Sequence, residues 1–179
     1  EQPLLISVAA GVTVKSLQQG LQQPRMPIVR CMPNTPALIG EGVTGLFASF
    51  FVNVEQEAWA EDLLSTVGRT VWVEEERLID VVTAISGSGP AYYFYLMQAM
   101  IEAGVELGLS TTQAEQFVLQ TGRGAAKMAW ASTDDVATLR ARVTSPGGTT
   151  AAAIECFDDA KAFANIKQAV KAAYERAEQ

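Results

Sequence analysis

Three short stretches combine glycine or proline with polar side chains, a combination that can hold a small polar or anionic ligand. They are SPGGTT at 145–150, MPNTP at 32–36 and SGSGP at 86–90. In the first, two glycines before an expected helix would gather several backbone N–H donors around one point, with two hydroxyls beside them. A small carboxylate would fit there, and a helix cap with a glycine-rich turn accounts for the same spacing. Both interpretations stay open on spacing alone.

The other two stretches also allow either a ligand or a purely structural role. MPNTP follows an expected parallel strand at its carboxyl end, where open α/β sheets bind ligands, and Asn34 offers an amide. The alternative there is a proline-fixed loop. SGSGP leads into an expected helix whose first N–H groups could hold an anion, or it forms a tight turn between two helices. A further pattern, GEGVTG at 40–45, precedes a strand and would place Glu41 against a pyrophosphate, so it does not predict a dinucleotide site.

The composition excludes several classes of chemistry. The chain of 179 residues contains no histidine, which removes histidine metal sites, Ser-His-Asp systems and histidine acid–base catalysis. Cys31 and Cys156 are too few for a disulfide framework and lack metal-ligand spacing, so we expect buried thiols, no bound metal and a cytoplasmic location. With 13 basic against 20 acidic side chains, the net charge of −7 argues against nucleic-acid binding.

The first 73 residues alternate apolar runs with helical stretches, which predicts part of an open α/β sheet. Continuous apolar runs are typical of strands that are buried on both faces. A doubly wound sheet would have its ligand-binding first half upstream of Glu1, so we expect this chain to be a fragment. Gly68 is expected to end the second helix. The expected strands lie at 3–8, 27–32, 42–51 and 70–73, and the expected helices at 13–21 and 54–67.

The pattern becomes entirely helical after the acidic turn at 74–76, so we place a domain boundary there, with domains at 1–74 and 75–179. The most apolar stretch, 90–109, carries Gln98, Glu102 and Glu106 in one narrow stripe, as in a helix buried in protein or at a subunit interface. Two carboxylates argue against a membrane span. Further helices are expected from Ser110, which begins a capping box, up to Arg142, and at 149–158 and 161–178.

Four stretches in this order resemble the pyrroline-5-carboxylate reductase family. They are AAGVT at 9–13, RCMPNTPA at 30–37, SGSGPAY at 86–92 and VTSPGGTT at 143–150. The resemblance spans essentially the whole chain but lacks the amino-terminal half-domain with the dinucleotide fingerprint. It implies a fold in which an α/β partial Rossmann-like sheet, the carboxyl half of an NAD(P)-binding domain, is followed by an all-α dimerisation and substrate-binding domain.

The resemblance further implies reduction of the cyclic imine Δ1-pyrroline-5-carboxylate to L-proline with NADPH, or sometimes NADH, in the last step of proline biosynthesis. Family members are homodimers or higher homo-oligomers whose active site is built across the dimer interface. By motif position, backbone N–H groups of Gly148, Thr149 and Thr150 would bind the substrate carboxylate. The Thr150 hydroxyl would lie near the ring nitrogen as the catalytic group, and Glu76 would lie close to the substrate.

For the cofactor, the resemblance implies contacts from Ala9, Ala10 and Gly11 at the end of the first strand, and from Asn34 and Arg142. Two stretches depart from the family pattern. Residues 133–136 are TDDV where many members have Glu-x-His-Pro, and Arg142 stands where relatives often carry an amide side chain.

Two other functions remain as alternatives to the reductase. One is a non-catalytic helical dimerisation module, and the other is a reductase of another cyclic imine or of a 3-hydroxyacid, since architecture alone does not set function. The SPGGTT stretch argues against the second alternative. For the 179 residues alone we expect little or no activity.

Overall fold

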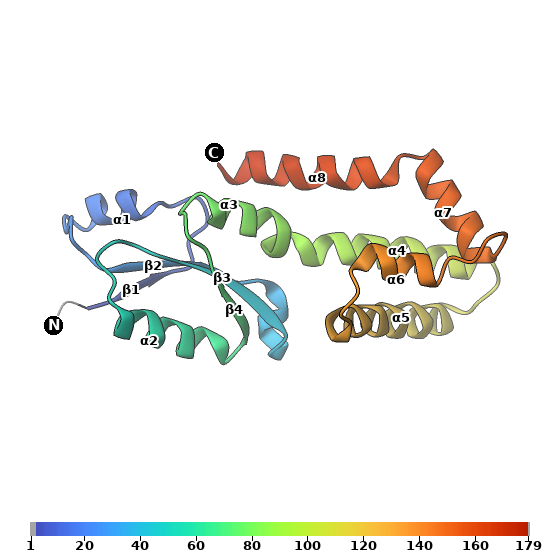
Figure 1. Ribbon diagram of the computed structural model, residues 1–179, viewed down its shortest axis with the longest axis horizontal. Helices are drawn as coiled ribbons and strands as arrows, with labels where there is room; N and C mark the ends of the chain where they lie inside the picture. The colour runs from blue at the N-terminus through green and yellow to red at the C-terminus, as the bar shows by residue number, and fades with distance from the viewer. Residues whose placement is uncertain (1–2, 179) are drawn as a thin grey trace. The chain divides into compact units, whose positions relative to one another are not determined.

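The computed structural model describes residues 3–178 as a four-stranded sheet followed by helices (Figure 1). The predicted fold class, an α/β partial Rossmann-like sheet followed by an all-α region, is confirmed. The strands are β1 (Leu5–Ser7), β2 (Ile28–Met32), β3 (Gly42–Ala48) and β4 (Gly68–Trp72). The helices are α1 (Val14–Gly20), η1 (Thr35–Ile39), α2 (Val54–Ser65), α3 (Leu78–Val82), η2 (Thr83–Gly87), α4 (Gly89–Glu106), α5 (Thr111–Ala131), α6 (Val136–Arg142), α7 (Thr149–Asp159) and α8 (Ala162–Ala177).

The sheet has the order β1-β2-β3-β4 and mixes parallel with antiparallel pairs. β1 and β2 are parallel and are connected through α1, as the strand–helix–strand pattern predicted. β3 and β4 are likewise parallel and are connected through α2. Between β2 and β3 the chain has only the short η1, which is too short for a parallel crossover, so these two strands are antiparallel.

Alternate residues of β2 belong to two separate apolar clusters, one on each face of the sheet. Ile28 packs with Val14 of α1 and with Met26. Val29 and Cys31 pack with residues of β3 and α2. Figure 1 accordingly shows α1 and α2 on opposite faces of the sheet. Arg30 has the same parity as Ile28 and therefore belongs to the α1 face.

Gly68 does not end a helix, and the prediction for this residue is wrong. Helix α2 ends at Ser65 with Thr66 as its C-cap, and Gly68 is the first residue of β4. Its φ is +148°, and a Cβ at this position would lie 2.1 Å from the carbonyl oxygen of Gly42. Close backbone approach between β3 and β4, not helix termination, therefore requires the glycine.

The SGSGP stretch is helical, so neither a loop with free donors nor a tight turn describes it. The turn η2 is a π-helix that continues α3 toward α4, and the Ser88 N–H donates to the Thr83 carbonyl oxygen at 2.8 Å. The Thr83 and Ser86 hydroxyls donate to carbonyl oxygens four residues earlier. These bonds satisfy groups that an anion would otherwise have to use.

Contacts along the chain divide it into two compact units, residues 1–91 with 168–179, here the sheet unit, and residues 92–167, here the helical unit. In the helical unit, Ser110 and Gln113 form the predicted capping box at the start of α5. Of the two cysteines, Cys31 is buried as expected, but Cys156 on α7 is exposed. The domain boundary between residues 74 and 75 stays a prediction.

No helix within residues 3–178 is both long enough and apolar enough to cross a bilayer.

Candidate functional site

Glu76 lies against the start of α1 in the sheet unit. Its Oε1 atom accepts a hydrogen bond of 2.6 Å from the Val14 N–H, the first N–H of that helix. The same oxygen accepts a bond of 2.9 Å from Nη1 of Arg30. A carboxylate is favoured at a helix N-terminus because the unpaired N–H groups there carry partial positive charge. The Thr13 hydroxyl caps the same helix by accepting from the Ser16 N–H.

Arg30 places a positive charge in the middle of a buried strand. All residues of β2 are buried, and the Arg30 side chain is 3% exposed. Besides the bond to Glu76, its Nη2 lies 3.8 Å from Oδ1 of Asp80. Burial raises the pKa of the Asp80 carboxyl, while the Arg30 guanidinium works in the opposite direction. The carboxylates of Glu76 and Asp80 thus both lie close to the buried guanidinium of Arg30.

The segment predicted to contact the cofactor follows directly after β1. Ala9, Ala10 and Gly11 are all exposed, and Gly11 adopts a positive φ of +70°. A Cβ added at Gly11 would meet one atom within 4 Å, the Ala177 carbonyl oxygen at 3.9 Å. The residues at the carboxyl end of the parallel strand β1 are therefore small, and they leave the backbone accessible to a flat ring. These residues fit a nicotinamide dinucleotide at this edge of the sheet.

Asn34 has a structural bond as well as its predicted ligand role. It precedes η1, and its Oδ1 accepts a bond of 2.9 Å from the Val43 N–H in β3. This bond fixes the amide orientation, because the oxygen must face β3 and the NH₂ group is then turned away from it. The available group of Asn34 is therefore a donor.

The SPGGTT stretch forms a turn that ends at the N-terminus of α7 in the helical unit. Gly147 has a φ of +71°, and the Gly148 N–H donates to the Ser145 carbonyl oxygen at 3.0 Å. A Cβ at Gly148 would lie 2.8 Å from the Ser145 hydroxyl oxygen, so the turn requires glycine there. Thr149 and Thr150 are the first residues of α7, where backbone N–H groups have no partner within the helix.

Arg142 at the end of α6 forms an ion pair with Asp134, just before that helix begins. The two departures from the family pattern therefore contact each other. The Arg142 side chain is 64% exposed, so it remains accessible to a ligand.

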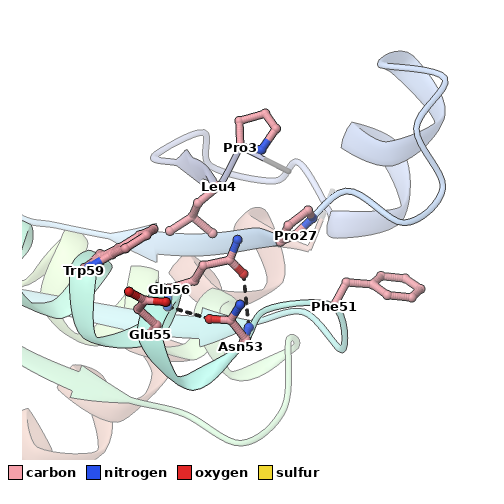
Figure 2. A pocket seen from close by; sticks show the side chains of 8 residues that line it. All are labelled: Pro3, Leu4, Pro27, Phe51, Asn53, Glu55, Gln56 and Trp59. Carbon is pink, nitrogen blue, oxygen red and sulfur yellow. Dashed lines mark hydrogen bonds between the residues drawn. The ribbon is translucent and has the colours of Figure 1, made fainter. Parts of the chain in front are cut away.

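A pocket of 510 Å³ in the sheet unit is lined by none of these residues. Figure 2 shows its lining side chains, including Leu4, Trp59 and the Asn53–Gln56 pair at the start of α2. Pro3 and Pro27 place it at the amino ends of β1 and β2, whereas open α/β sheets bind ligands at the carboxyl ends. Within residues 3–178, no cluster of three or more histidine, cysteine or acidic residues could hold a metal ion.

Known proteins resemble this chain along nearly its entire length. Residues 76–179 match the family model described as pyrroline-5-carboxylate reductase dimerisation. The chain belongs to the pyrroline-5-carboxylate reductase family. A pyrroline-5-carboxylate reductase from Pseudomonas aeruginosa is 52% identical over 175 residues, covering 98% of this chain and 64% of the relative. The chain spans 64–66% of the length of four curated reductases that are 40–52% identical to it.

Solved structures of the reductase family have the same fold. A pyrroline-5-carboxylate reductase from Coxiella burnetii superposes with a TM-score of 0.93 at 42% identity, covering 99% of this chain and 66% of that one. A pyrroline carboxylate reductase from Plasmodium falciparum with NADP bound has a TM-score of 0.92 at 34% identity, covering 98% of this chain and 70% of that one.

The structure groups the residues predicted for the site by unit. The sheet unit contains Ala9, Ala10, Gly11, Asn34 and Glu76, and the helical unit contains Arg142, Gly148, Thr149 and Thr150. Sequence reasoning missed Arg30, which contacts Glu76 from 46 positions earlier in the chain. The available signal was a charged residue inside an apolar run expected to be buried, because such a residue needs a carboxylate partner.

Proposed function

We propose that the protein containing this chain reduces Δ1-pyrroline-5-carboxylate to L-proline with NADPH, or with NADH, as the last step of proline biosynthesis. The observation that carries this proposal is the match over 98% of the chain, at 52% identity, to a protein named pyrroline-5-carboxylate reductase. Hydride transfer to a cyclic iminium depends on placement and charge complementarity more than on a strong base, so a chain without histidine can support it.

The substrate carboxylate binds at the start of α7. The Gly148 N–H is already bonded to Ser145, so the donors that remain are the N–H groups of Thr149 and Thr150. Gly148 contributes by its lack of a Cβ, which lets the turn close at that point. A helix N-terminus favours an anion through these donors and through the helix dipole.

Thr150 is the catalytic residue. Its hydroxyl belongs to the first turn of α7, on the same residue as one of the backbone donors proposed for the carboxylate. There it orients the imine and relays a proton from solvent to the ring nitrogen, so that the hydride is transferred to a cationic iminium. Glu76 favours positive charge on that ring because its carboxylate is negatively charged. The Val14 N–H and Arg30 hold this carboxylate in place.

The dinucleotide binds at the carboxyl edge of the sheet and, when bound, supplies the hydride. Ala9, Ala10 and Gly11 leave the backbone open there, and Asn34 presents its NH₂ group as a donor. Arg142 contacts the cofactor through the part of its guanidinium that Asp134 does not occupy. Because the chain spans about two thirds of its relatives' length, we expect the 179 residues alone to turn over little or no substrate.

The helical unit forms a homodimer, or part of a larger homo-oligomer. Large apolar side chains on α4 are exposed in the single chain, including Tyr93, Tyr95 and Leu96 at 66%, 79% and 49%. The matched family model is itself named for dimerisation. We place the protein in the cytoplasm, since Cys31 and Cys156 are both free thiols, the state that a reducing compartment maintains.

The test follows NADPH absorbance with pyrroline-5-carboxylate for two proteins, this chain and the product translated from the initiation codon of its gene. Proline formation by the longer protein alone is the expected result. Activity in neither would overturn the proposal and would favour a non-catalytic dimerisation module or a reductase of another cyclic imine. Equal activity in the 179-residue chain would contradict our account of where the cofactor binds.

A further inference from the structure

Burying Arg30 at its position in the sheet is energetically unfavourable. It stands at the centre of β2, every residue of which is buried, and the guanidinium has little access to water. Its Nη2 atom is buried and makes no hydrogen bond within residues 3–178, and Oδ1 of Asp80 lies 3.8 Å from it. A buried donor left without a bond is costly.

Stability alone does not account for this arginine. Replacing a buried ion pair by apolar side chains of similar size is often neutral or stabilising, because desolvation offsets the attraction between the charges. Neighbouring positions of β2 are occupied by valine, isoleucine, cysteine and methionine, so an apolar residue is the local norm. We therefore look for a role of the Arg30 guanidinium other than stabilising the fold.

The contacts of Glu76 indicate what that role is. Both hydrogen bonds to its carboxylate, from the Val14 N–H and from Arg30 Nη1, reach the same oxygen, Oε1. The side chain is 28% exposed, and Oε2 accepts no hydrogen bond from residues 3–178. One oxygen is thus anchored on the protein, and the other is available to a ligand.

We propose that Arg30 is a positioning residue, which anchors Oε1 of Glu76 beside the first turn of α1 so that Oε2 is presented to the positively charged ring of the substrate. This inference rests on the proposed function, and it adds a residue that acts on the substrate only through Glu76. Because Val14 begins the helix that follows Ala9–Gly11, the same anchor also fixes the end of the cofactor segment.

The experiment measures steady-state kinetics and hydrogen exchange on the protein translated from the initiation codon of its gene. The variants are Arg30→Met, which removes the anchor, and Arg30→Lys, which keeps a cation but lacks the planar fork of donors. Arg77→Met is the matched control, because Arg77 adjoins Glu76 in sequence but forms an exposed pair with Glu75. Exchange is followed by mass spectrometry on peptides that contain the Val14 amide.

We expect Arg30→Met to raise KM for pyrroline-5-carboxylate about ten- to a hundredfold, as loss of a charged hydrogen bond does. The kcat value changes by less than about threefold, because ground-state binding of the cationic ring is what weakens. Arg30→Lys shows a smaller rise in KM, and in both variants the Val14 amide exchanges about tenfold faster than in the wild type. Arg77→Met leaves KM and exchange unchanged.

Three results would overturn the inference. The first is a wild-type KM in folded Arg30→Lys or Arg30→Met, with or without faster exchange at Val14. The second is a loss of activity that only follows the loss of folded protein, with KM unchanged in the remainder, which makes Arg30 purely structural. The third is a wild-type protein that reduces no pyrroline-5-carboxylate, in which case the proposed function fails and faster exchange would assign Arg30 only to holding α1.

Discussion

The sheet unit and the helical unit differ in how far their apolar side chains are buried. Ile28, Val29 and Leu46 of the sheet are 0% exposed and pack under α1 or α2. In residues 92–167, the buried hydrophobic side chains are Ala114 and Val118, both on α5. Tyr95 on α4 and Phe117 on α5 remain 79% and 63% exposed.

The apolar residues of the two units therefore have different roles, one in the core of a single chain and the other in association between chains. The sheet closes its own core and holds the candidate site residue Glu76 by buried contacts within one chain. The helices present apolar surface that a single chain leaves in water, as subunits of obligate dimers do before they associate. We infer that a second copy of the chain completes the core of the helical unit.

The largest expected effect comes from truncating the same side chain in each unit. Leu46→Ala leaves a cavity among Val29, Cys31 and Ala60 and lowers the free energy of unfolding by about 2–5 kcal/mol. Leu96→Ala on α4, 49% exposed in the single chain, instead weakens association between copies. Urea unfolding and sedimentation of both variants separate the two effects. An equal loss of unfolding free energy, with association unchanged for Leu96→Ala, would break the comparison.

A second prediction concerns the site loop of the helical unit. Thr150→Ala lowers kcat for pyrroline-5-carboxylate by about ten- to a thousandfold, because the proposed proton relay and orienting hydroxyl are lost. Thr150→Ser retains the hydroxyl and restores most of the rate. Thr144→Ala is the matched control, since the Thr144 hydroxyl donates to the Arg140 carbonyl oxygen within the chain. Unchanged turnover in Thr150→Ala would remove this residue from the mechanism.

The smallest effect is a difference in thiol reactivity between the units. Burial in the sheet raises the pKa of the Cys31 thiol from 9.0 to about 11, so it stays protonated at neutral and mildly alkaline pH. The thiolate is the reactive form, so Cys31 resists a disulfide reagent until the pH approaches 11 or the protein unfolds. Exposed Cys156 reacts in the folded chain. The check is to titrate the reactive thiols with a disulfide reagent at pH 8, before and after adding urea, with the variant Cys156→Ser as reference. Fast labelling of Cys31 in folded Cys156→Ser would contradict the assignment.

Local sequence patterns predicted most of the elements because those elements depend on local physics. The apolar runs of β1 and β2, the helix between them and the capping box at Ser110 each follow from neighbouring residues. The family resemblance supplied the candidate site residues, which no periodicity could single out.

What the sequence did not predict depends on contacts between distant residues. Gly68 is required by the approach of Gly42 from another strand, and Arg30 is explained by Glu76. Arg142 and Asp134 were identified separately as departures from the family pattern, and only their positions in the structure bring them together as an ion pair. For Gly68 and Arg30 the deciding partner lies beyond the window of any helix or strand pattern, whereas Asp134 and Arg142 stand near the two ends of α6.

Sedimentation equilibrium, which gives the mass of the chain in solution, decides whether a second copy completes the helical unit. The exposed apolar faces of α4 and α5 predict a species of twice the chain mass of 19.2 kDa, or a larger multiple of it. The variant Tyr95→Glu places a charge on that surface and shifts the population toward monomer. A wild-type chain that remains a folded 19.2 kDa monomer at every concentration would contradict the claim that a second copy completes the helical unit.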